Sequence, residues 1–347
     1  MSDTKPDYDS VLLVSFGGPE SRADVMPFLE NVVLGKNVPP ERLEEVAAHY
    51  NHFEGRSPLN EQNRALIAAL EAELRNSEID LPVYWGNRNW NPFIVDALAR
   101  MREDGKKRAL AFFTSAYGSY SGCRQYRENI EKAREELGAG APVVDKIRAF
   151  YNHPGFIEAN VDRLLAALGT LPKERRECAR IAFTGHSIPV AMSESCDYVE
   201  QLDETARLVA EGARHDRWQV VYQSRSGPSH VQWLGPDILE HLDALSRINV
   251  KDVVVAPIGF LSDNMEVIWD LDREARDYAS ELGITMTRAA TVGTHPAFVA
   301  MIRELIEERL GTVSGRQALG NRGPAPDVCP PDCCMYQPRV SRPPEHA

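Results

Sequence analysis

The sequence predicts an α/β protein with two similar Rossmann-like lobes, each a four-stranded parallel sheet flanked by helices. Short apolar runs rich in β-branched residues alternate with longer amphipathic stretches, which is the pattern of parallel strands joined by helical crossovers. Eight such runs occur, four on each side of residue 150. A chain of 347 residues is also long enough for two domains.

The expected strands and helices alternate along the chain. The strands are expected at residues 11–16, 83–86, 109–115, 143–148, 180–184, 219–223, 253–258 and 284–289. The main helices are expected at residues 61–75, 126–137, 156–168, 198–213, 236–246 and 266–281. In a fold of this kind, ligands bind in the cleft beyond the carboxyl ends of the strands.

This pattern divides the chain into three segments. Residues 1–150 form the first lobe, and residues 151–310 form the second, whose last helix is expected to pack back on the first lobe. Both lobes begin with a strand that runs into a turn closed by proline, Pro19 in one and Pro189 in the other, which indicates an internal repeat. Residues 311–347 are rich in Gly, Pro and Arg and are expected to form an irregular tail unless something pins it.

Composition limits the partners of the protein. The formal net charge of -12, from 39 basic and 51 acidic side chains, gives no electrostatic reason to bind nucleic acid or anionic lipid. The N-terminus lacks the basic and apolar regions of a secretory signal. The longest apolar run, residues 253–261, is interrupted by Pro257 and Gly259 and is too short to cross a bilayer. We therefore expect a cytoplasmic protein without a transmembrane segment.

Nucleotide binding, the first function suggested by a doubly wound fold, is disfavoured by the turns. A phosphate site would need a glycine-rich turn that leads into a helix N-terminus, and neither G-x-G-x-x-G nor G-x-x-x-x-G-K-[ST] occurs. The turn after the first strand runs from Phe16 through Gly17, Gly18 and Pro19 to Glu20. Proline and an acidic residue suit a phosphate poorly.

His186 is the first candidate catalytic residue. It follows directly on the strand at 180–184, so it should project into the cleft at the carboxyl edge of the second sheet. A histidine at a strand end is often structural, but Gly185 before it allows a ligand to approach and Pro189 stiffens the turn. Imidazole also titrates near neutral pH, which suits a base or a metal ligand.

An acidic stripe is the second candidate. Glu266, Asp270 and Glu274 follow the apolar strand at 253–258 and fall at positions i, i+4 and i+8 of the expected helix. Like charges at this spacing destabilise a helix, although a solvated face would explain Glu274 well. Oxygen ligands in a row are able to pass a cation inward or protons outward.

Three thiols crowd into the tail as Cys329, Cys333 and Cys334. Neighbouring cysteines form strained disulfides, so a shared metal centre is the better interpretation. Four thiolates would complete a zinc site or an iron-sulfur centre. Spacing alone leaves the fourth ligand open among Cys123, Cys178 and Cys196, although Cys178 precedes a strand and should lie at the opposite edge of the sheet.

Five motifs in order along the chain resemble the ferrochelatase family. They are Ser15-Phe16-Gly17-Gly18-Pro19; Gly55-Arg56-Ser57-Pro58-Leu59; His186-Ser187-Ile188-Pro189; Tyr222 to Gly227 with Trp233 to Asp237; and the acidic segment from Asp263 to Asp272. The resemblance covers nearly the whole chain. It implies two Rossmann-like lobes with a porphyrin cleft between them, whose lip belongs to the first lobe, which agrees with the fold predicted above.

The resemblance implies an enzyme of haem biosynthesis, a lyase that inserts ferrous iron into a porphyrin. The compact chain is similar to the bacterial soluble type, for which coproporphyrin III is the expected substrate and iron coproporphyrin (coproheme) the product, with protoporphyrin IX as the alternative. A non-catalytic porphyrin or haem carrier with a redox-sensing cluster is a competing hypothesis, as is a chelatase for another tetrapyrrole. We expect a monomer whose partners are the porphyrin and Fe²⁺.

The resemblance also assigns roles. His186 and Glu266 are the expected catalytic pair and contact the substrate iron, and Asp270 and Glu274 form an acidic path. Some relatives carry a two-iron two-sulfur (2Fe-2S) cluster with one interior ligand and three from the tail, which selects Cys123 to join Cys329, Cys333 and Cys334. The expected porphyrin contacts are Phe16, Arg56, Ser57, Tyr117, Tyr120, Arg124, Tyr126 and Asn264, with Trp90 and Trp269 as further candidates to line the ring.

Two positions depart from the family pattern. Many members have histidine where this chain has Asn264, and many of the Gram-positive type have tyrosine where it has Phe16. Asparagine does not ionise near neutral pH, and phenylalanine has no oxygen to offer to iron. More of the chemistry therefore falls on His186 and Glu266.

Overall fold

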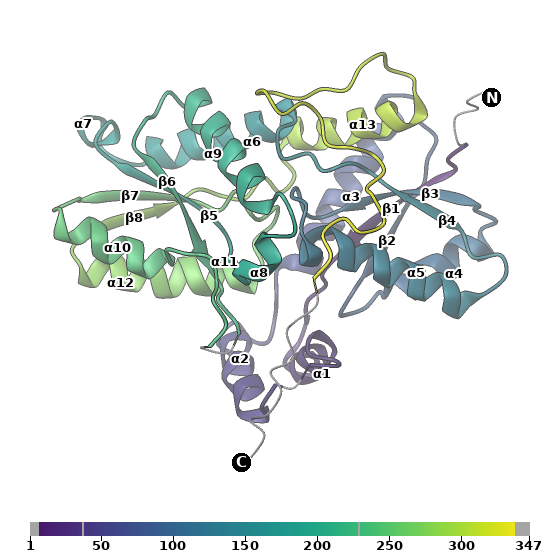
Figure 1. Cartoon of the computed structure of the whole chain (residues 1–347), viewed down its shortest axis with the longest axis horizontal. Coiled ribbons are helices and arrows are strands. Elements are labelled where there is room, and N and C mark those ends of the chain that lie inside the picture. The colour runs from purple at the N-terminus through teal and green to yellow at the C-terminus, as the bar shows by residue number, and fades with distance from the viewer. Residues whose placement is uncertain (1–6, 37, 228–229, 337–347) are drawn as a thin grey trace.

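Two four-stranded parallel sheets carry the two lobes in the computed structural model, which describes residues 7–36, 38–227 and 230–336 (Figure 1). The first sheet consists of β1 (Ser10–Ser15), β2 (Val83–Asn87), β3 (Arg108–Phe113) and β4 (Val143–Lys146). The second consists of β5 (Arg180–His186), β6 (Trp218–Gln223), β7 (Asp252–Ala256) and β8 (Thr285–Arg288). The predicted fold class is confirmed, and each predicted strand is present.

The two sheets share one topology. Their strand orders are β2-β1-β3-β4 and β6-β5-β7-β8, so β1 and β5 occupy the same position between two parallel neighbours. All residues of β1 and of β7 are buried, because helices cover both faces of such a sheet. The similar starts of the two halves in sequence therefore correspond to equivalent strands.

Helices surround both sheets. Those of the first lobe are α1 (Arg22–Val32), α2 (Pro40–His52), α3 (Leu59–Asn76), α4 (Ile94–Glu103), a π-helical turn η1 (Tyr120–Arg124) and α5 (Gln125–Leu137). Those of the second are α6 (Pro154–Gly169), α7 (Lys173–Arg176), α8 (Val190–Ser193), α9 (Tyr198–Gly212), α10 (Ile238–Arg247), α11 (Met265–Trp269), η2 (Asp270–Ala275), α12 (Arg276–Glu281) and α13 (Pro296–Leu310). The sequence patterns missed α1, α2, α4, α7 and α8. Of these, α1 and α2 project together below the sheets in Figure 1.

The predicted helix at 266–281 is not uniform. It consists of α11, the π-helical segment η2 and α12. A π-helix closes its hydrogen bonds from i to i+5, so the regular α-helix expected here is interrupted at Asp270 and Glu274. The expectation of one continuous α-helix is wrong in this detail, but Asp270 still lies near enough to Glu266 and Glu274 to feel both charges.

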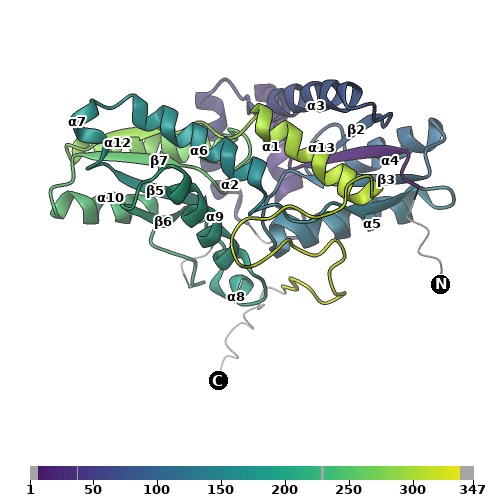
Figure 2. The ribbon, with the colours of Figure 1, turned by 90° about the horizontal axis from the view of Figure 1, so that it is seen from above.

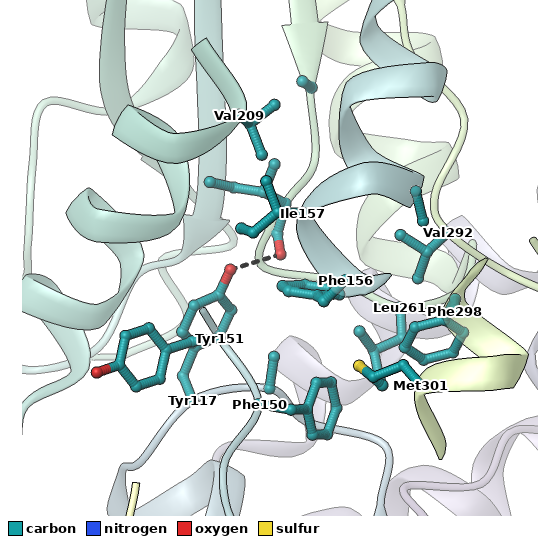
Figure 3. Packing of buried hydrophobic residues seen from close by; sticks show 14 of the residues in the cluster. Tyr117, Phe150, Tyr151, Phe156, Ile157, Val209, Leu261, Val292, Phe298 and Met301 are labelled. Atoms are coloured by element: carbon teal, nitrogen blue, oxygen red, sulfur yellow. Dashed lines mark hydrogen bonds between the residues drawn. The ribbon is translucent and has the colours of Figure 1, made fainter. Parts of the chain in front are cut away.

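One apolar core joins the two lobes. It includes Leu13 and Leu110 of the first sheet together with Ile181 and Val254 of the second. Figure 3 shows its aromatic centre, where Phe150 and Phe156 pack with Phe298. Helix α13 packs against α6 and also against α3 of the first lobe. Within the described residues, no helix is both long and apolar enough to cross a membrane.

The described part of the tail, residues 311–336, has no helix or strand but is held in place (Figure 2). Arg148, which is buried, donates to Gln317 O at 2.7 Å and forms a two-point ion pair with Glu308. Asn152 Nδ2 donates to Gly323 O at 2.9 Å. The tail is thus attached to the rest of the protein by hydrogen bonds to its backbone carbonyls and not by regular secondary structure.

Candidate active site

His186 ends β5 at the carboxyl edge of the second sheet. Its backbone carbonyl accepts a hydrogen bond from Tyr198 Oη at 2.9 Å, and its Nδ1 faces the carbonyl oxygen of Ser187. With Nδ1–H donating to that carbonyl, Nε2 is the nitrogen that points away. A Cβ on Gly259 would lie 2.6 Å from the Cα of Gly185, so this corner depends on the close approach of two glycines.

Glu266 meets His186 from α11. Its Oε1 lies 3.3 Å from His186 Nε2, and the two side chains are 40% and 32% exposed, so both reach open space. Gln223, at the end of β6, donates its Nε2–H to the backbone carbonyl of Glu266 at 2.8 Å. Asn264 caps α11 and contacts the Glu266 carboxylate. The ends of β5 and β6 and the helix that follows β7 therefore hold the pair in place.

The electrostatics favour a charged pair at neutral pH. Burial alone would lower the pKa of His186, but the charge and hydrogen bond of Glu266 raise it to about 9. Burial alone would raise the pKa of Glu266, but His186 and Asn264 hold it below its ordinary value. The sequence suggested an imidazole that titrates near neutral pH; the structure instead places an imidazolium beside a carboxylate.

The acidic residues continue outward from this pair. Burial, together with the charges of Glu266 and Glu274, raises the pKa of Asp270 to about 7, although a hydrogen bond from Ser224 Oγ opposes the shift. Glu274 is exposed. Within the described residues, no lysine or arginine pairs with these three acids, whereas Arg288 pairs with the neighbouring Asp263 and Asp272. Asp270 and Glu274, which lead from the pair to solvent, thus have no lysine or arginine partner within the described residues.

A cavity of about 240 Å³ lies between the lobes in front of His186 and Glu266. The first lobe contributes Phe16, Ser57, Arg88 and Thr114 to its wall. A second cavity of about 270 Å³, bounded by α1 and α2, adjoins it and shares Phe16, Tyr50, Met265 and Glu266. Both cavities therefore open onto the catalytic candidates from the side of the first lobe.

Comparison with known proteins identifies the family. A family model described as Ferrochelatase matches residues 8–310. A ferrochelatase from Rhodopirellula baltica is 56% identical over 340 residues, covering 98% of this chain and 96% of its own. The chain belongs to the ferrochelatase family. It is therefore a metal chelatase.

Other similarities agree with this assignment. A coproporphyrin III ferrochelatase from Streptomyces griseus is 49% identical, covering 94% of this chain and 93% of its own. The solved structure of SirB from Bacillus subtilis with Fe³⁺ covers 88% of this chain and 98% of its own, with a TM-score of 0.52 and 14% sequence identity. That likeness shows the two-lobed fold alone. The family match ends at residue 310, so the cysteine-containing tail lies outside it.

Some of the predicted porphyrin contacts line the cavity of the chelatase, and others lie away from it. Phe16, Ser57, Tyr117, Tyr126 and Asn264 line the cavity. The other three predicted contacts, Arg56, Tyr120 and Arg124, are not among its lining residues. Tyr120 Oη donates to Glu128 at 3.1 Å, and Arg124 Nη1 donates to tail carbonyls. The predicted ring candidate Trp269 lies at the adjoining cavity, where it stacks on His49 at 4.0 Å.

Sequence reasoning missed Arg88. Its guanidinium lies 5.6 Å from the ring centre of Phe16 and 5.0 Å from that of Tyr126, and its Nε donates to Asn129 Oδ1 at 2.9 Å. No carboxylate pairs with it among the described residues. Arg88 directly follows β2, and this place in the sequence already predicts a position at the carboxyl edge of the first sheet.

The cysteines of the tail lie beside the first lobe. Arg124 Nη1 donates to Pro331 O at 2.6 Å and to Cys333 O at 2.9 Å, which places the tail next to Cys123. Burial raises the pKa of the Cys123 thiol, and the nearby Cys329 and Cys333 raise it further while Lys146 opposes them. All six cysteines are free. Within the described ranges, no three His, Cys, Asp or Glu side chains converge as a metal site.

Proposed function

We propose that the protein inserts ferrous iron into coproporphyrin III in haem biosynthesis, with His186 and Glu266 at the reacting centre. The observation that carries this proposal is the 3.3 Å approach of His186 Nε2 to Glu266 Oε1 in front of a cavity between the lobes. The names of the relatives, several of which are coproporphyrin III ferrochelatases, support this choice of substrate.

The reaction requires two pyrrole protons to leave and Fe²⁺ to lose water. A cleft that binds a distorted ring lowers the barrier, because distortion exposes the nitrogen lone pairs. His186 accepts a pyrrole proton once its own proton has passed on, and its imidazole or the Glu266 carboxylate contacts the incoming iron. The carboxylate also stabilises the imidazolium that forms.

The acidic row provides an exit for these protons. Glu266 lies at the cavity, Asp270 follows it with a pKa of about 7, and Glu274 is exposed. A carboxyl group with such a pKa gains and loses protons readily at neutral pH.

The first lobe holds the porphyrin. Coproporphyrin carries four propionates, and Arg88 is a half-buried cation at the cavity wall without a carboxylate partner within the described part of the chain. A guanidinium binds a carboxylate through two parallel hydrogen bonds. Phe16 and Tyr126, whose ring centres lie 5.6 Å and 5.0 Å from the Arg88 guanidinium, provide aromatic surface for the macrocycle.

Anaerobic turnover tests the proposed substrate directly. Purified protein is supplied with Fe²⁺ and either coproporphyrin III or protoporphyrin IX, and metalloporphyrin formation is followed by absorbance. We expect the higher kcat/KM with coproporphyrin III. A preference for protoporphyrin IX would overturn the substrate assignment, and tight porphyrin binding without turnover would identify a carrier. Turnover restricted to sirohydrochlorin would indicate a different chelatase.

We further propose that Cys123, Cys329, Cys333 and Cys334 hold a 2Fe-2S cluster. The donors fit such a group chemically, because four free thiols from one lobe and the tail lie near enough for their charges to interact. Cys333 Sγ and Cys334 Sγ are 3.3 Å apart, and Arg124 holds their loop beside Cys123. When bound, the cluster would tie the tail to the first lobe.

Anaerobic reconstitution with iron and sulfide tests this second proposal. We expect visible absorption that Cys123→Ser and Cys333→Ser abolish. Cys178→Ser is the matched control, because Cys178 is exposed and follows α7. Loss of the absorption in Cys196→Ser but not in Cys123→Ser would show that Cys196 is the fourth ligand, since Cys196 also lies near Cys333. A colourless protein that binds zinc instead would overturn the cluster.

The cytoplasmic location and the monomeric state stay predictions from the sequence. Light scattering of the purified chain after gel filtration is expected to give the mass of one chain, 38.8 kDa. A mass of twice that value would contradict the monomer.

A further inference from the structure

Asn264 uses both ends of its side-chain amide at the head of α11. Its Oδ1 accepts a hydrogen bond from the backbone N–H of Val267 at 3.0 Å, which caps the helix. Its Nδ2 donates to Glu266 Oε2 at 3.2 Å. The amide plane is therefore fixed by the helix on one side and by the carboxylate on the other.

This arrangement determines which oxygen of Glu266 faces the cavity. Oε2 is occupied by Asn264, and Oε1 lies 3.3 Å from His186 Nε2. A glutamate that is 40% exposed would otherwise sample several rotamers, because nothing else in the described residues bonds to its carboxylate. The backbone of Glu266 is held separately by Gln223, so Asn264 restrains the side chain alone.

We infer that Asn264 is a positioning residue that holds Glu266 in register with His186. This inference rests on the proposed roles of the pair. Asparagine suits the task because its amide carries an acceptor and a donor in one plane and keeps both at every working pH. Asn264 has no ionisable group, but its side-chain amide supplies a fixed hydrogen-bonded restraint on the Glu266 carboxylate.

Substitutions can separate the cap from the restraint. In Asn264→Ser and Asn264→Asp the new side chain still caps α11, because serine and aspartate are both good N-cap residues. Serine is too short to donate to Oε2, and aspartate has no donor and repels Glu266. Asn264→His supplies an acceptor and an N–H donor while its imidazole is neutral, so it serves as the rescue variant.

We expect kcat to fall about tenfold in Asn264→Ser, the value of one hydrogen bond to a charged group, with KM for porphyrin within twofold of the native value. Asn264→Asp should lose more, and Asn264→His should recover most of the rate. Asp237→Ala, which removes the cap of α10, is the control for helix capping and should leave kcat unchanged. Native kcat in both Asn264→Ser and Asn264→Asp would overturn the inference.

A second measurement does not depend on turnover. The ¹⁵N chemical shift of His186 Nε2 at a single pH reports its hydrogen bond to Glu266. We expect this resonance in Asn264→Ser to move toward its value in Glu266→Ala, and to stay at its native value in Asp237→Ala. An unmoved resonance in Asn264→Ser shows that Asn264 only caps the helix. If instead His186→Ala retains turnover while the resonance moves as expected, the proposed catalytic roles fail and the restraint stands.

Discussion

The two lobes have the same sheet topology but present different chemistry at their carboxyl edges. In the second lobe, β5 ends at His186, and the segments that follow β6 and β7 bring Ser224 and Glu266 to the same corner. In the first lobe, the equivalent edge presents Phe16 and Arg88. The imidazole and carboxyl groups with shifted pKa values, His186, Glu266 and Asp270, gather on one side of the cleft, and aromatic and cationic surface gathers on the other.

This difference indicates a division of labour within a repeated fold. Substitutions in the second lobe should change kcat, because that lobe carries the groups proposed to move protons and contact iron. Substitutions in the first lobe should change KM, because that lobe carries the groups proposed to hold the porphyrin. The split between the two kinetic constants is therefore the test of the comparison.

The largest effect is expected from His186→Ala. Loss of the proposed base should reduce kcat by about 10²- to 10⁴-fold, while the porphyrin still binds. Stopped-flow absorbance gives the rate, and fluorescence quenching gives porphyrin affinity. Near-native turnover would show that His186 is not needed for the chemistry. Loss of porphyrin binding would show that His186 also helps to hold the porphyrin ring.

Glu266→Gln is expected to change both the rate and its pH dependence. The pKa of His186 is raised to about 9 by Glu266, so the native kcat/KM should rise with pH toward about 9 as the imidazolium loses its proton. Without the carboxylate, the two largest causes that raise the pKa of His186 are lost, so this pKa should fall from about 9. The rise in kcat/KM should therefore move to lower pH, while the maximal kcat falls about 10- to 100-fold. An unmoved profile would show that the two groups do not titrate together.

Arg88→Gln should affect binding alone. We expect KM for coproporphyrin III to rise about tenfold with kcat within twofold, because one charge-assisted contact to a propionate is lost. The tetramethyl ester of coproporphyrin III should show no such difference between native protein and variant, and Arg88→Lys should recover part of the affinity. A fall in kcat at unchanged KM would break the division between the lobes.

The smallest effect is expected from Phe16→Tyr. The ring of Phe16 packs edge-on against Phe28 at 6.2 Å and lies beside Arg88, so the residue contributes shape to the wall. An added hydroxyl should change turnover by less than about threefold. A tenfold gain in kcat would show that the first lobe lacks an iron ligand that the reaction can use.

The sequence by itself determined the two sheets and the place of the catalytic candidates. Buried parallel strands appear in the sequence as continuous apolar runs, so all eight strands were predicted. A residue that follows such a run lies at the carboxyl edge of a sheet. His186 and Glu266 were found in this way. The same rule places Arg88, which directly follows β2, at the carboxyl edge of the first sheet.

Only the tertiary structure decided how distant residues meet. Arg124 was predicted to contact the porphyrin, yet it bonds to Cys333 O across 209 positions of sequence, because packing of the tail and not local pattern selects its partner. The π-helical segment at Asp270 was equally hidden, since a change in hydrogen-bond register leaves no trace in composition. The pKa of His186 depends on every neighbour at once: burial lowers it, and the charge and hydrogen bond of Glu266 overcome that effect and raise it to about 9.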